Sequence, residues 1–353
     1  MPRLLLLHEE QGPGGIHTVL KTLQSSLIAQ GWQITSLAMR PWPVGPRALW
    51  QAWQAWRLAR QADVLLASNN FRPAYVAVLL GMLARQPAVV WVHGPLQAVL
   101  SCERPRTLKH RLLHWLYRHS QLVCVSQSSR ASLIDWMDCP GLQAQVIRNP
   151  APPLRETVAT PAPPEAAEVS GCIDLGFVGR LSVEKRPDWL IEVLQQLPPH
   201  IRLNVVGDGP LLAELQSAGA DLARAGRLRW HGAVPVSADT YSPWQLTLLC
   251  SAYEGYPMVA LESMASGVPC VATPLPALRE MLSTEGADWL AAKDSPTALA
   301  QKVLQVLQSP PETRRTQALA IARRHDAAAF GQQWHAMLLA QVQPQAPQTG
   351  GHA

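Results

Sequence analysis

Short apolar runs alternate with longer segments of helical periodicity along the first half of the chain. The apolar runs have the length of buried strands, and the segments between them, such as residues 16–30, have apolar positions at the spacing of a helix. Strands are expected at Leu4–Leu7, Ile34–Ala38, Val64–Ala67, Val89–Val92, Leu122–Val125 and Val146–Ile147. This alternation predicts parallel strands joined by helical crossovers.

Residues 150–164 break this pattern. The string PAPPLRETVATPAPP has six prolines and almost no periodicity, which is typical of a linker. Alternation restarts after it, with strands expected at 172–178, 203–206, 228–230, 246–250 and 270–272. The sequence therefore predicts an α/β protein with two Rossmann-like, doubly wound domains. We expect them to face each other across a cleft lined by the carboxyl ends of their strands, where open α/β sheets bind ligands.

The domain boundaries follow from these patterns. The N-terminal domain is expected over residues 1–150, the linker over 151–168 and the C-terminal domain over 169–325. A last apolar helix is expected at 326–340. The tail 341–353 is rich in Gln, Pro and Gly, so we expect it to be disordered.

Charge divides the chain in a similar way. Residues 1–150 carry 15 Lys and Arg against 6 Asp and Glu, and the remainder carries 15 against 19. A basic first half suggests an anionic partner, such as nucleic acid, a phospholipid surface or a phosphorylated acceptor. Six scattered cysteines without a C-x-x-C pair indicate reduced thiols in a cytosolic protein.

No leader and no membrane span are expected. The apolar run near the N-terminus is too short for an export signal, and no stretch of about 18 apolar residues follows it. Residues 103–119, ERPRTLKHRLLHWLYRH, place Arg and Lys between Leu and Trp at helical spacing. This pattern fits either a helix on an anionic membrane surface or an ordinary amphipathic helix packed on the sheet.

The string EGYPMVALE places two carboxylates, Glu254 and Glu262, eight residues apart. Glu254 precedes a Gly-Tyr-Pro loop, and Glu262 lies about one turn into the helix that follows. The N-terminus of such a helix offers free N–H groups and a positive dipole to a diphosphate, and Glu262 could accept hydrogen bonds from ribose. In the alternative, Glu254 caps the helix and Glu262 is a solvated helix residue.

A second candidate site follows the strand expected at 172–178. Arg180 and Lys185 lie on the loop where that strand ends, and they could neutralise two phosphates, one through a planar fork and one as a point charge. This charge matters because a departing nucleoside diphosphate gains negative charge as the glycosidic bond breaks. The alternative is a solvated basic loop.

Three weaker signals lie at other strand ends. Gly14 and Gly15 follow the first strand, where glycines let the backbone approach a phosphate closely; a tight turn is the alternative. His93 ends another strand and could hydrogen-bond a sugar or a phosphate, or have a structural role alone. Gly207 and Gly209, in the string GDGP, suggest a turn that starts a helix, although this loop could also touch the nucleoside.

No metal site is expected from the sequence. Cys and His residues show no ligand spacing, and no D-x-D string occurs. Positive side chains and a helix dipole would then have to stabilise a leaving group in place of a metal ion.

Taken together, these strings resemble glycosyltransferase family 4, whose members have the two-Rossmann GT-B fold. The resemblance covers the chain up to about residue 340 and is densest from Gly176 to Pro274. The strings GFVGRLSVEK, VVGDGP, HGAVP and SAYEGYPMVALESMASGVPCVAT occur in the family's order. Its N-terminal features are matched by Gly14-Gly15, His93-Gly94, Val125-Ser126 and Arg148-Asn149-Pro150.

The resemblance implies a transferase that moves a hexose from a nucleotide-sugar co-substrate, without a metal or other cofactor, and retains the anomeric configuration. Glu254 would orient the donor sugar, Glu262 would bind the ribose and His93 would contact the transferred sugar. The first domain would bind the acceptor, and the last helix would cross back onto it. Diphosphate contacts are implied for Arg180, Lys185, Gly14, Gly15, Gly255, Tyr256, Pro257 and Met258, and nucleoside-side contacts for Gly207, Gly209 and Val234.

The Gly-Tyr-Pro-Met string is similar to that of bacterial lipopolysaccharide and polysaccharide transferases that use UDP-sugars. This similarity implies a UDP-hexose donor and a lipopolysaccharide-core, polysaccharide or lipid-linked acceptor. Two positions depart from the family pattern, because Arg186 stands where a Gly is usual and Pro257 removes one N–H donor. We expect a cytoplasmic protein, peripheral on the inner face of the cell membrane, with no nucleic-acid partner.

Two other functions stay open on the same residues. A sugar-nucleotide epimerase or hydrolase of the same fold would release free nucleotide without an acceptor. A non-catalytic nucleotide-sugar binding protein would tolerate the loss of Glu254, whereas a transferase would not. A nicotinamide-dependent oxidoreductase is disfavoured because the G-x-G-x-x-G fingerprint is absent.

Overall fold

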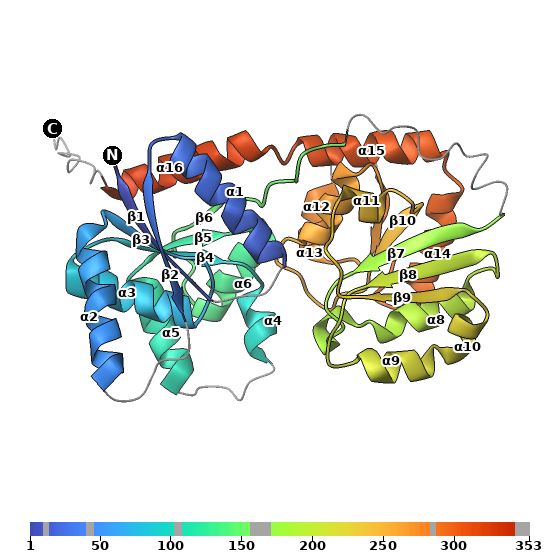
Figure 1. Cartoon of the computed structure of the whole chain (residues 1–353), viewed down its shortest axis with the longest axis horizontal. Helices are drawn as coiled ribbons and strands as arrows, with labels where there is room; N and C mark the ends of the chain where they lie inside the picture. Colours follow the sequence, from blue (N-terminus) through green and yellow to red (C-terminus); the bar gives the residue numbers. More distant parts are fainter. Residues whose placement is uncertain (10–13, 40–45, 102–107, 156–170, 283–286, 343–353) are drawn as a thin grey trace. The chain divides into compact units, whose positions relative to one another are not determined.

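The computed structural model describes the chain apart from residues 10–13, 40–45, 102–107, 156–170, 283–286 and 343–353. The chain divides into two compact units (Figure 1). Unit 1 is made of the residues up to Asn149 together with those from Ala327 onward, and unit 2 is made of Pro150–Asp326. Unit 1 therefore takes its residues from both ends of the chain.

A parallel sheet forms the centre of unit 1, with the strand order β2-β1-β3-β4-β5-β6. Leu4 pairs with Ile34 on one side and Val64 on the other, so β1 is an interior strand. Leu4 to Leu7 are all buried, as expected for a strand covered by helices on both faces. The strands are β1 (Arg3–Glu9), β2 (Gln33–Met39), β3 (Val64–Ala67), β4 (Ala88–Val92), β5 (Gln121–Cys124) and β6 (Ala144–Val146).

Helices cover both faces of this sheet (Figure 1). Leu5 and Leu7 point to one face and pack in a core shared with α2, α3, α5 and α6. On the other face, α1 and the last helix, α16, pack against each other. The helices of unit 1 are α1 (Gly15–Ala29), α2 (Pro46–Gln61), α3 (Arg72–Ala84), α4 (Leu96–Ser101), α5 (Leu108–Arg118), α6 (Gln127–Met137) and α16 (Ala327–Val342).

Unit 2 has a second parallel sheet, with the strand order β11-β10-β7-β8-β9. Trp244 packs directly against the central strand, where a Cβ on Gly176 would lie 1.8 Å from the indole ring. The strands are β7 (Ile173–Val178), β8 (Ile201–Val206), β9 (Leu228–Gly232), β10 (Leu246–Leu249) and β11 (Cys270–Ala272). The helices are η1 (Val183–Lys185), α8 (Asp188–Gln196), α9 (Leu212–Ala218), α10 (Ala220–Arg224), α11 (Ala238–Tyr241), α12 (Met258–Ala265), α13 (Pro276–Leu282), α14 (Pro296–Leu307) and α15 (Pro311–Arg323).

The predicted fold class is confirmed, because both sheets are parallel and alternate with helices. Differences concern element ends. Residues 341 and 342, expected in a disordered tail, belong to α16, which continues to Val342; the rest of that predicted tail lies outside the described residues. Most of the predicted linker lies outside them too. Its first part is bonded within unit 2, where Ala151 N donates to His325 O at 2.8 Å and Arg155 N to Ala265 O at 3.0 Å.

None of the helices in the described parts of the chain combines the length and apolar character needed to cross a membrane. The cysteines among the described residues are free thiols, and three of them are buried: Cys124, Cys250 and Cys270.

Candidate functional site

Three loops meet at the carboxyl edge of the unit 2 sheet, following β7, β8 and β10. The β7 loop is held to the β8 loop by backbone hydrogen bonds from Gly179 N to Val206 O at 3.0 Å and from Leu181 N to Asp208 O at 2.9 Å. It is also held to the β10 loop, because Ala252 N donates to Glu184 O at 2.8 Å. The three loops therefore form one connected edge, which is where open parallel sheets bind ligands.

Gly207 and Gly209 allow the β7 and β8 loops to pack this closely. A Cβ on Gly207 would lie 1.9 Å from Gly179 O, and one on Gly209 would lie 2.4 Å from Leu181 O. Gly207 also has a φ of +142°, which side chains rarely adopt. The structure thus gives both glycines a packing role, and the nucleoside contact expected for them stays a prediction.

Lys185 and Glu254, both predicted from the sequence, meet across two of these loops. The Nζ atom of Lys185 lies 2.6 Å from Oε1 of Glu254. The same oxygen accepts a hydrogen bond from the Ser251 hydroxyl at 2.6 Å. The Glu254 side chain is 11% exposed and that of Lys185 is 29% exposed, so the pair is partly shielded but reachable from solvent.

Glu184 adds a second carboxylate beside the two predicted cations. Burial opposes the ionisation of Glu184, but the hydrogen bond from Ser182 at 2.6 Å and the charges of Lys185 and Arg180 hold its pKa below the usual value. Arg180 itself is exposed. The β7 loop thus carries two cations near one anion, with Arg180 facing solvent.

Arg186, where the family pattern has a Gly, has a left-handed backbone with φ 46° and ψ 53°. This conformation explains why Gly is usual there. The side chain is held by an ion pair with Asp294 at 2.7 Å and lies over the Trp189 ring, 4.6 Å from its centroid. These two contacts offset the strain of a side chain in this conformation.

The β10 loop leads into α12, which begins at Met258 after Pro257. Among the described residues, no side chain caps this helix, so its first N–H groups and the positive end of its dipole are available to an anion. The side chains of Tyr256 and Met258 are buried, and the Tyr256 hydroxyl lies 2.5 Å from His325 Nε2. Of these predicted diphosphate contacts, Met258 can offer its backbone N–H at the start of α12, and Pro257 has none to offer.

Glu262 lies on α12 and accepts a hydrogen bond from the Tyr241 hydroxyl at 2.7 Å. Burial raises the pKa of Glu262, and the bond from Tyr241 partly offsets this effect. Tyr241 was missed in the sequence, because it lies 21 positions from Glu262 on the four-residue helix α11. A signal for that helix was present: Ser237 and Thr240 form a capping box at its N-terminus.

Val234 follows β9, and its side chain is 44% exposed. Its position beyond the end of a strand agrees with the expected side of the sheet. Its role toward a nucleoside stays a prediction.

In unit 1, Gly14 and Gly15 stand at the N-terminus of α1. Gly14 has φ 179°, an extended conformation that any residue adopts, so the backbone does not require glycine here. A Cβ on Gly14 would meet no atom within 4 Å. The described residues also provide no side-chain cap for this helix. Among the described residues, no atom therefore lies where a side chain at Gly14 would be, and residues 10–13, which precede it, lie outside the described residues.

His93 follows β4 and stacks on Trp91, with ring centroids 4.4 Å apart. Burial lowers the pKa of His93 to about 4, although a hydrogen bond with the Ser68 backbone opposes the shift. The ring is therefore neutral near pH 7. Its Nε2 atom is shut off from solvent and has no hydrogen-bond partner among the described residues. An unpaired buried polar atom costs stability, so its place at a strand end marks a candidate contact for a ligand hydroxyl.

The support beneath His93 comes from the end of the chain. Trp91 contacts Trp334 of α16 at a centroid distance of 4.6 Å and Phe330 at 6.1 Å. Trp91 and Trp334 are fully buried. The orientation of His93 therefore depends on packing supplied by α16.

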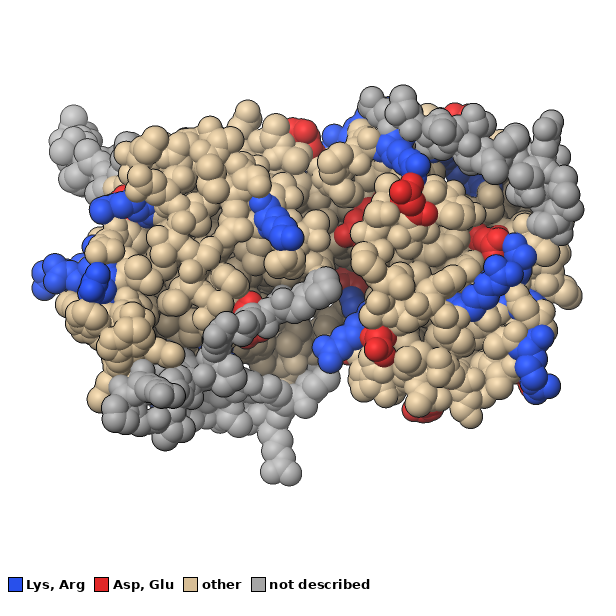
Figure 2. Space-filling view, viewed as in Figure 1, with Lys and Arg blue, Asp and Glu red and all other residues tan. Residues whose placement is uncertain are grey.

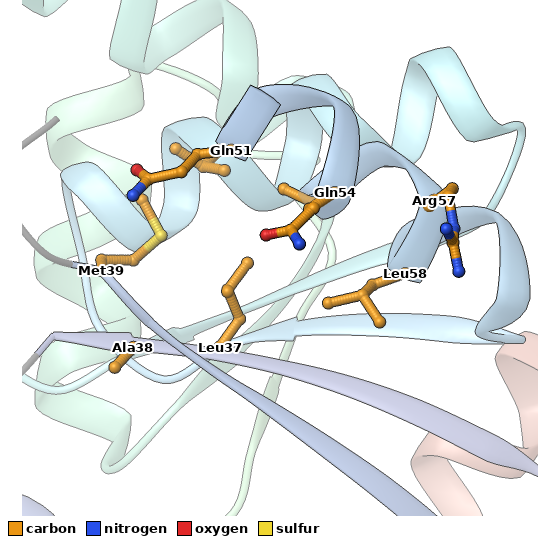
Figure 3. A pocket seen from close by; sticks show the side chains of 9 residues that line it. Leu37, Ala38, Met39, Gln51, Gln54, Arg57 and Leu58 are labelled. Carbon is orange, nitrogen blue, oxygen red and sulfur yellow. The ribbon is translucent and has the colours of Figure 1, made fainter. Parts of the chain in front are cut away.

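A separate cavity of about 360 Å³ lies between β2, α2 and α3 (Figure 3). Its lining mixes apolar side chains, such as Leu37 and Met39, with polar ones from α2, such as Gln51 and Gln54. Among the described residues that line it, Arg57 is the one cation. This lining suits a partly apolar ligand better than a nucleoside diphosphate.

In the described parts of the chain, no group of three or more His, Cys, Asp or Glu side chains could hold a metal ion.

Comparison with known proteins identifies the family to which these features belong. The model described as "Glycosyltransferase Family 4" matches residues 13–153, and the model described as "Glycosyl transferases group 1" matches residues 173–309. The chain is 32% identical over 148 residues to a lipopolysaccharide 1,6-galactosyltransferase of Salmonella typhimurium, which is 38% of each protein. It is also 32% identical over 142 residues to a GDP-mannose-dependent phosphatidylinositol dimannoside mannosyltransferase of Mycobacterium tuberculosis, covering 39% of this chain and 36% of that protein. These alignments span less than half the length of either curated relative.

Solved structures agree on the fold. Anabaena HepE in complex with UDP superposes with a TM-score of 0.78 at 21% identity, covering 96% of this chain and all of that one. A structure of HepE in complex with UDP-glucose superposes with a TM-score of 0.77. Because two glycosyltransferase models match successive parts of the chain and its whole length shares this fold, the chain belongs to the family 4 type of GT-B glycosyltransferases.

Proposed function

We propose that this protein transfers a hexose from a UDP-sugar to a lipopolysaccharide-core, polysaccharide or lipid-linked acceptor, with retention of configuration and without a metal ion. The observation that carries the proposal is the cluster of Lys185, Glu254 and the uncapped N-terminus of α12 at one edge of the unit 2 sheet. This cluster offers positive charge and N–H donors for a diphosphate beside a carboxylate for the sugar.

The diphosphate would be held by three positive elements. Arg180 and Lys185 supply formal charges from the β7 loop, and α12 supplies the positive end of its dipole. Glu262, farther along α12, would accept hydrogen bonds from the ribose hydroxyls. Since the negative charge on the diphosphate grows as its bond to the sugar breaks, these elements stabilise the transition state more than the bound donor.

In the proposed step, the bond between the anomeric carbon and the phosphate oxygen breaks on the face where the acceptor hydroxyl attacks. The acceptor oxygen forms the new bond to that carbon, and its proton goes to the departing phosphate oxygen. Front-face departure and attack retain the configuration. In this scheme Glu254 orients the donor sugar rather than forming a covalent bond.

Unit 1 would bind the acceptor. His93 is neutral near pH 7, so its unpaired Nε2 atom can hydrogen-bond a sugar hydroxyl without adding a charge. The N-terminus of α1, which no described side chain caps, and the lack of a side chain at Gly14 fit close approach of an anionic oxygen. Free thiols agree with a cytoplasmic location for the reaction.

UDP is proposed over GDP as the donor nucleotide. It is supported by the UDP and UDP-glucose complexes of HepE and by the similarity to a galactosyltransferase. GDP is the alternative donor nucleotide to test, because the name of the mannosyltransferase relative specifies GDP-mannose.

A thermal-shift panel of UDP, UDP-glucose, UDP-galactose, GDP and GDP-mannose, each with and without EDTA, tests the donor site. We expect UDP and a UDP-hexose to raise Tm by several degrees near saturation, with no change on addition of EDTA. Transfer is then assayed with labelled UDP-hexose and lipopolysaccharide or lipid extracts. Release of free hexose at the same rate without an acceptor would favour a hydrolase, and no shift with any nucleotide would refute the donor site.

A further inference from the structure

The outer side of α2, α3 and α5 exposes large apolar side chains instead of burying them. These three helices pack side by side on one face of the unit 1 sheet. Their outward side chains are 41–76% exposed. We call this surface the three-helix face, and its apolar members are Leu49, Trp50, Trp53, Leu79, Met82, Leu83, Leu112 and Trp115. Ile28 and Leu304, two other exposed large apolar side chains, lie on α1 and α14.

The α2 helix packs one apolar side on the sheet, with Ala55 and Ala59 buried and Trp56 partly buried against the core. Its other side leaves Trp50 and Trp53 outside. A helix that serves only to cover a sheet places its largest apolar side chains inward. The exposed indoles of α2 therefore indicate a second apolar environment outside the fold.

The α5 helix shows the same division and bears on the two alternatives for residues 103–119. Leu116 is buried in the core together with Leu113 and Tyr117, as expected for an amphipathic helix packed on the sheet. Leu112 and Trp115 remain 41% exposed. The helix therefore packs on the sheet and still presents apolar side chains outward, and residues 102–107 lie outside the described residues.

The charge of the three-helix face has one sign. The sequences of α2, α3 and α5 contain no Asp or Glu. Among their described side chains, the cations Arg57, Arg60, Arg72, Arg111 and Arg118 are exposed. Figure 2 shows how few acidic side chains appear over unit 1 on the face that it draws.

Arginine and tryptophan are also in contact along α2. The Arg57 guanidinium lies 5.0 Å from the centroid of the exposed Trp53 ring, and that of Arg60 lies 5.4 Å from the centroid of Trp56, which packs against the core. Such pairs hold a guanidinium directly beside an indole ring. This arrangement suits the boundary between lipid headgroups and acyl chains, where Trp is enriched and anionic headgroups attract Arg.

We propose that the three-helix face docks unit 1 on the surface of a bilayer that contains anionic lipids. Exposed Leu and Trp side chains enter the headgroup boundary, and the arginines around them contact anionic headgroups. A second copy of the chain is a poorer occupant, because two copies of this face would bring like charges together. Docking does not require the transfer reaction, but it would place the protein beside a lipid-linked acceptor.

Vesicle sedimentation of the full chain tests this proposal. We expect binding to vesicles made of equal parts phosphatidylcholine and phosphatidylglycerol, and much weaker binding to phosphatidylcholine alone. Raising the salt concentration should release part of the bound protein. Failure to bind the anionic vesicles at low salt would overturn the proposal.

Variants locate the binding surface. The double change Trp50→Gln with Trp53→Gln should lower vesicle affinity about tenfold or more, since it removes two interfacial indoles. Replacing Arg111 and Arg118 by Gln should lower it about fivefold for each charge removed. Ile28→Gln, on α1 over the other face of the sheet, is the matched control and should bind like the wild type.

Three results would contradict the assignment. Unchanged affinity in the Trp double variant, or an equal loss in the Ile28 variant, would remove the three-helix face as the docking surface. A wild-type dimer in solution that the Trp change converts to a monomer would identify a second copy as the occupant. Nucleotide binding, measured in parallel by thermal shift, keeps failure of docking distinct from failure of the proposed transferase function.

Discussion

The ammonium of Lys185 is paired with the carboxylate of Glu254 at 2.6 Å, although the two residues are 69 positions apart in the sequence. Each side chain therefore neutralises the other in the ligand-free protein. A diphosphate that binds Lys185 has to share it with Glu254 or take it over. Donor binding would thereby change the partners of the carboxylate beside the sugar.

Lys185→Ala is expected to weaken UDP binding by about tenfold or more, because a charge-assisted contact to phosphate is lost. Isothermal titration calorimetry of UDP binding measures the change. Arg224→Ala, which removes an exposed cation on α10, is the control and should leave the affinity unchanged. Equal affinity in the Lys185 variant would refute its role in holding the diphosphate.

Glu254→Gln should separate binding from transfer. Gln keeps the shape of the side chain and can still accept the bond from Ser251, but it no longer neutralises Lys185, so UDP affinity should be kept or increased. Transfer should fall by about 100-fold or more if the carboxylate orients the sugar in the transition state. Glu214→Gln, at an exposed position on α9, is the matched control. Full transfer activity in the Glu254 variant would argue that this carboxylate has no catalytic part.

Glu262→Gln should stabilise the protein while weakening nucleotide binding. Burial raises the pKa of Glu262, so the ionised side chain destabilises the folded state at neutral pH. The contribution of Glu262 to stability is complete below its unfolded pKa and is lost as the pH rises through its folded pKa. We therefore expect a gain of about 1 kcal/mol in the free energy of unfolding at pH 7.

The gain from Glu262→Gln should shrink toward pH 4, where the wild-type carboxyl is protonated in the folded protein. UDP affinity should fall about tenfold at pH 7, as hydrogen bonds from ribose to a charged acceptor are lost. Denaturant unfolding at the two pH values and calorimetry with UDP measure both effects. A variant less stable than the wild type at pH 7, with unchanged UDP affinity, would contradict both expectations.

His93→Gln should alter the response of the fold to acid. Burial lowers the pKa of His93 in the folded protein to about 4, whereas in the unfolded chain the ring takes up its proton near pH 6.5, the ordinary pKa of histidine. Its stabilising contribution is therefore present above pH 6.5 and lost as the pH falls toward 4. Between these pH limits the free energy of unfolding should fall by about 2–3 kcal/mol more in the wild type than in the variant. Denaturant unfolding of both proteins at pH 7 and pH 4.5 measures these losses. An equal loss of unfolding free energy in the two proteins would contradict this expectation.

Much of the fold could be predicted because strand length and helical spacing are local features of the sequence. Leu4–Leu7 and Val64–Ala67 are buried strands as expected, since an apolar run of that length in a parallel sheet is covered on both faces. Trp50 and Trp53 show the limit of this reasoning. Periodicity identifies their helix, but which side of it faces the sheet depends on packing against β strands far along the chain.

The candidate site was predictable where glycines and charges follow a strand directly. Lys185 and Glu254 could be named in this way, but their ion pair could not, because it joins loops after two different strands. Tyr241 was missed for the same reason. Tyr256 adjoins the Glu254 motif in sequence, yet its hydroxyl turns inward to His325, a direction that no local pattern indicates.

The position of α16 in unit 1 has a consequence for biosynthesis. A ribosome delivers every residue of Pro150–Asp326 before it delivers α16. All residues of unit 2 are therefore made before unit 1 has its last helix. Until Trp334 is present, the buried side of Trp91 lacks its cover. A chain that ends before Ala327 would leave this apolar surface of unit 1 exposed to chaperones, although every residue of unit 2 was present.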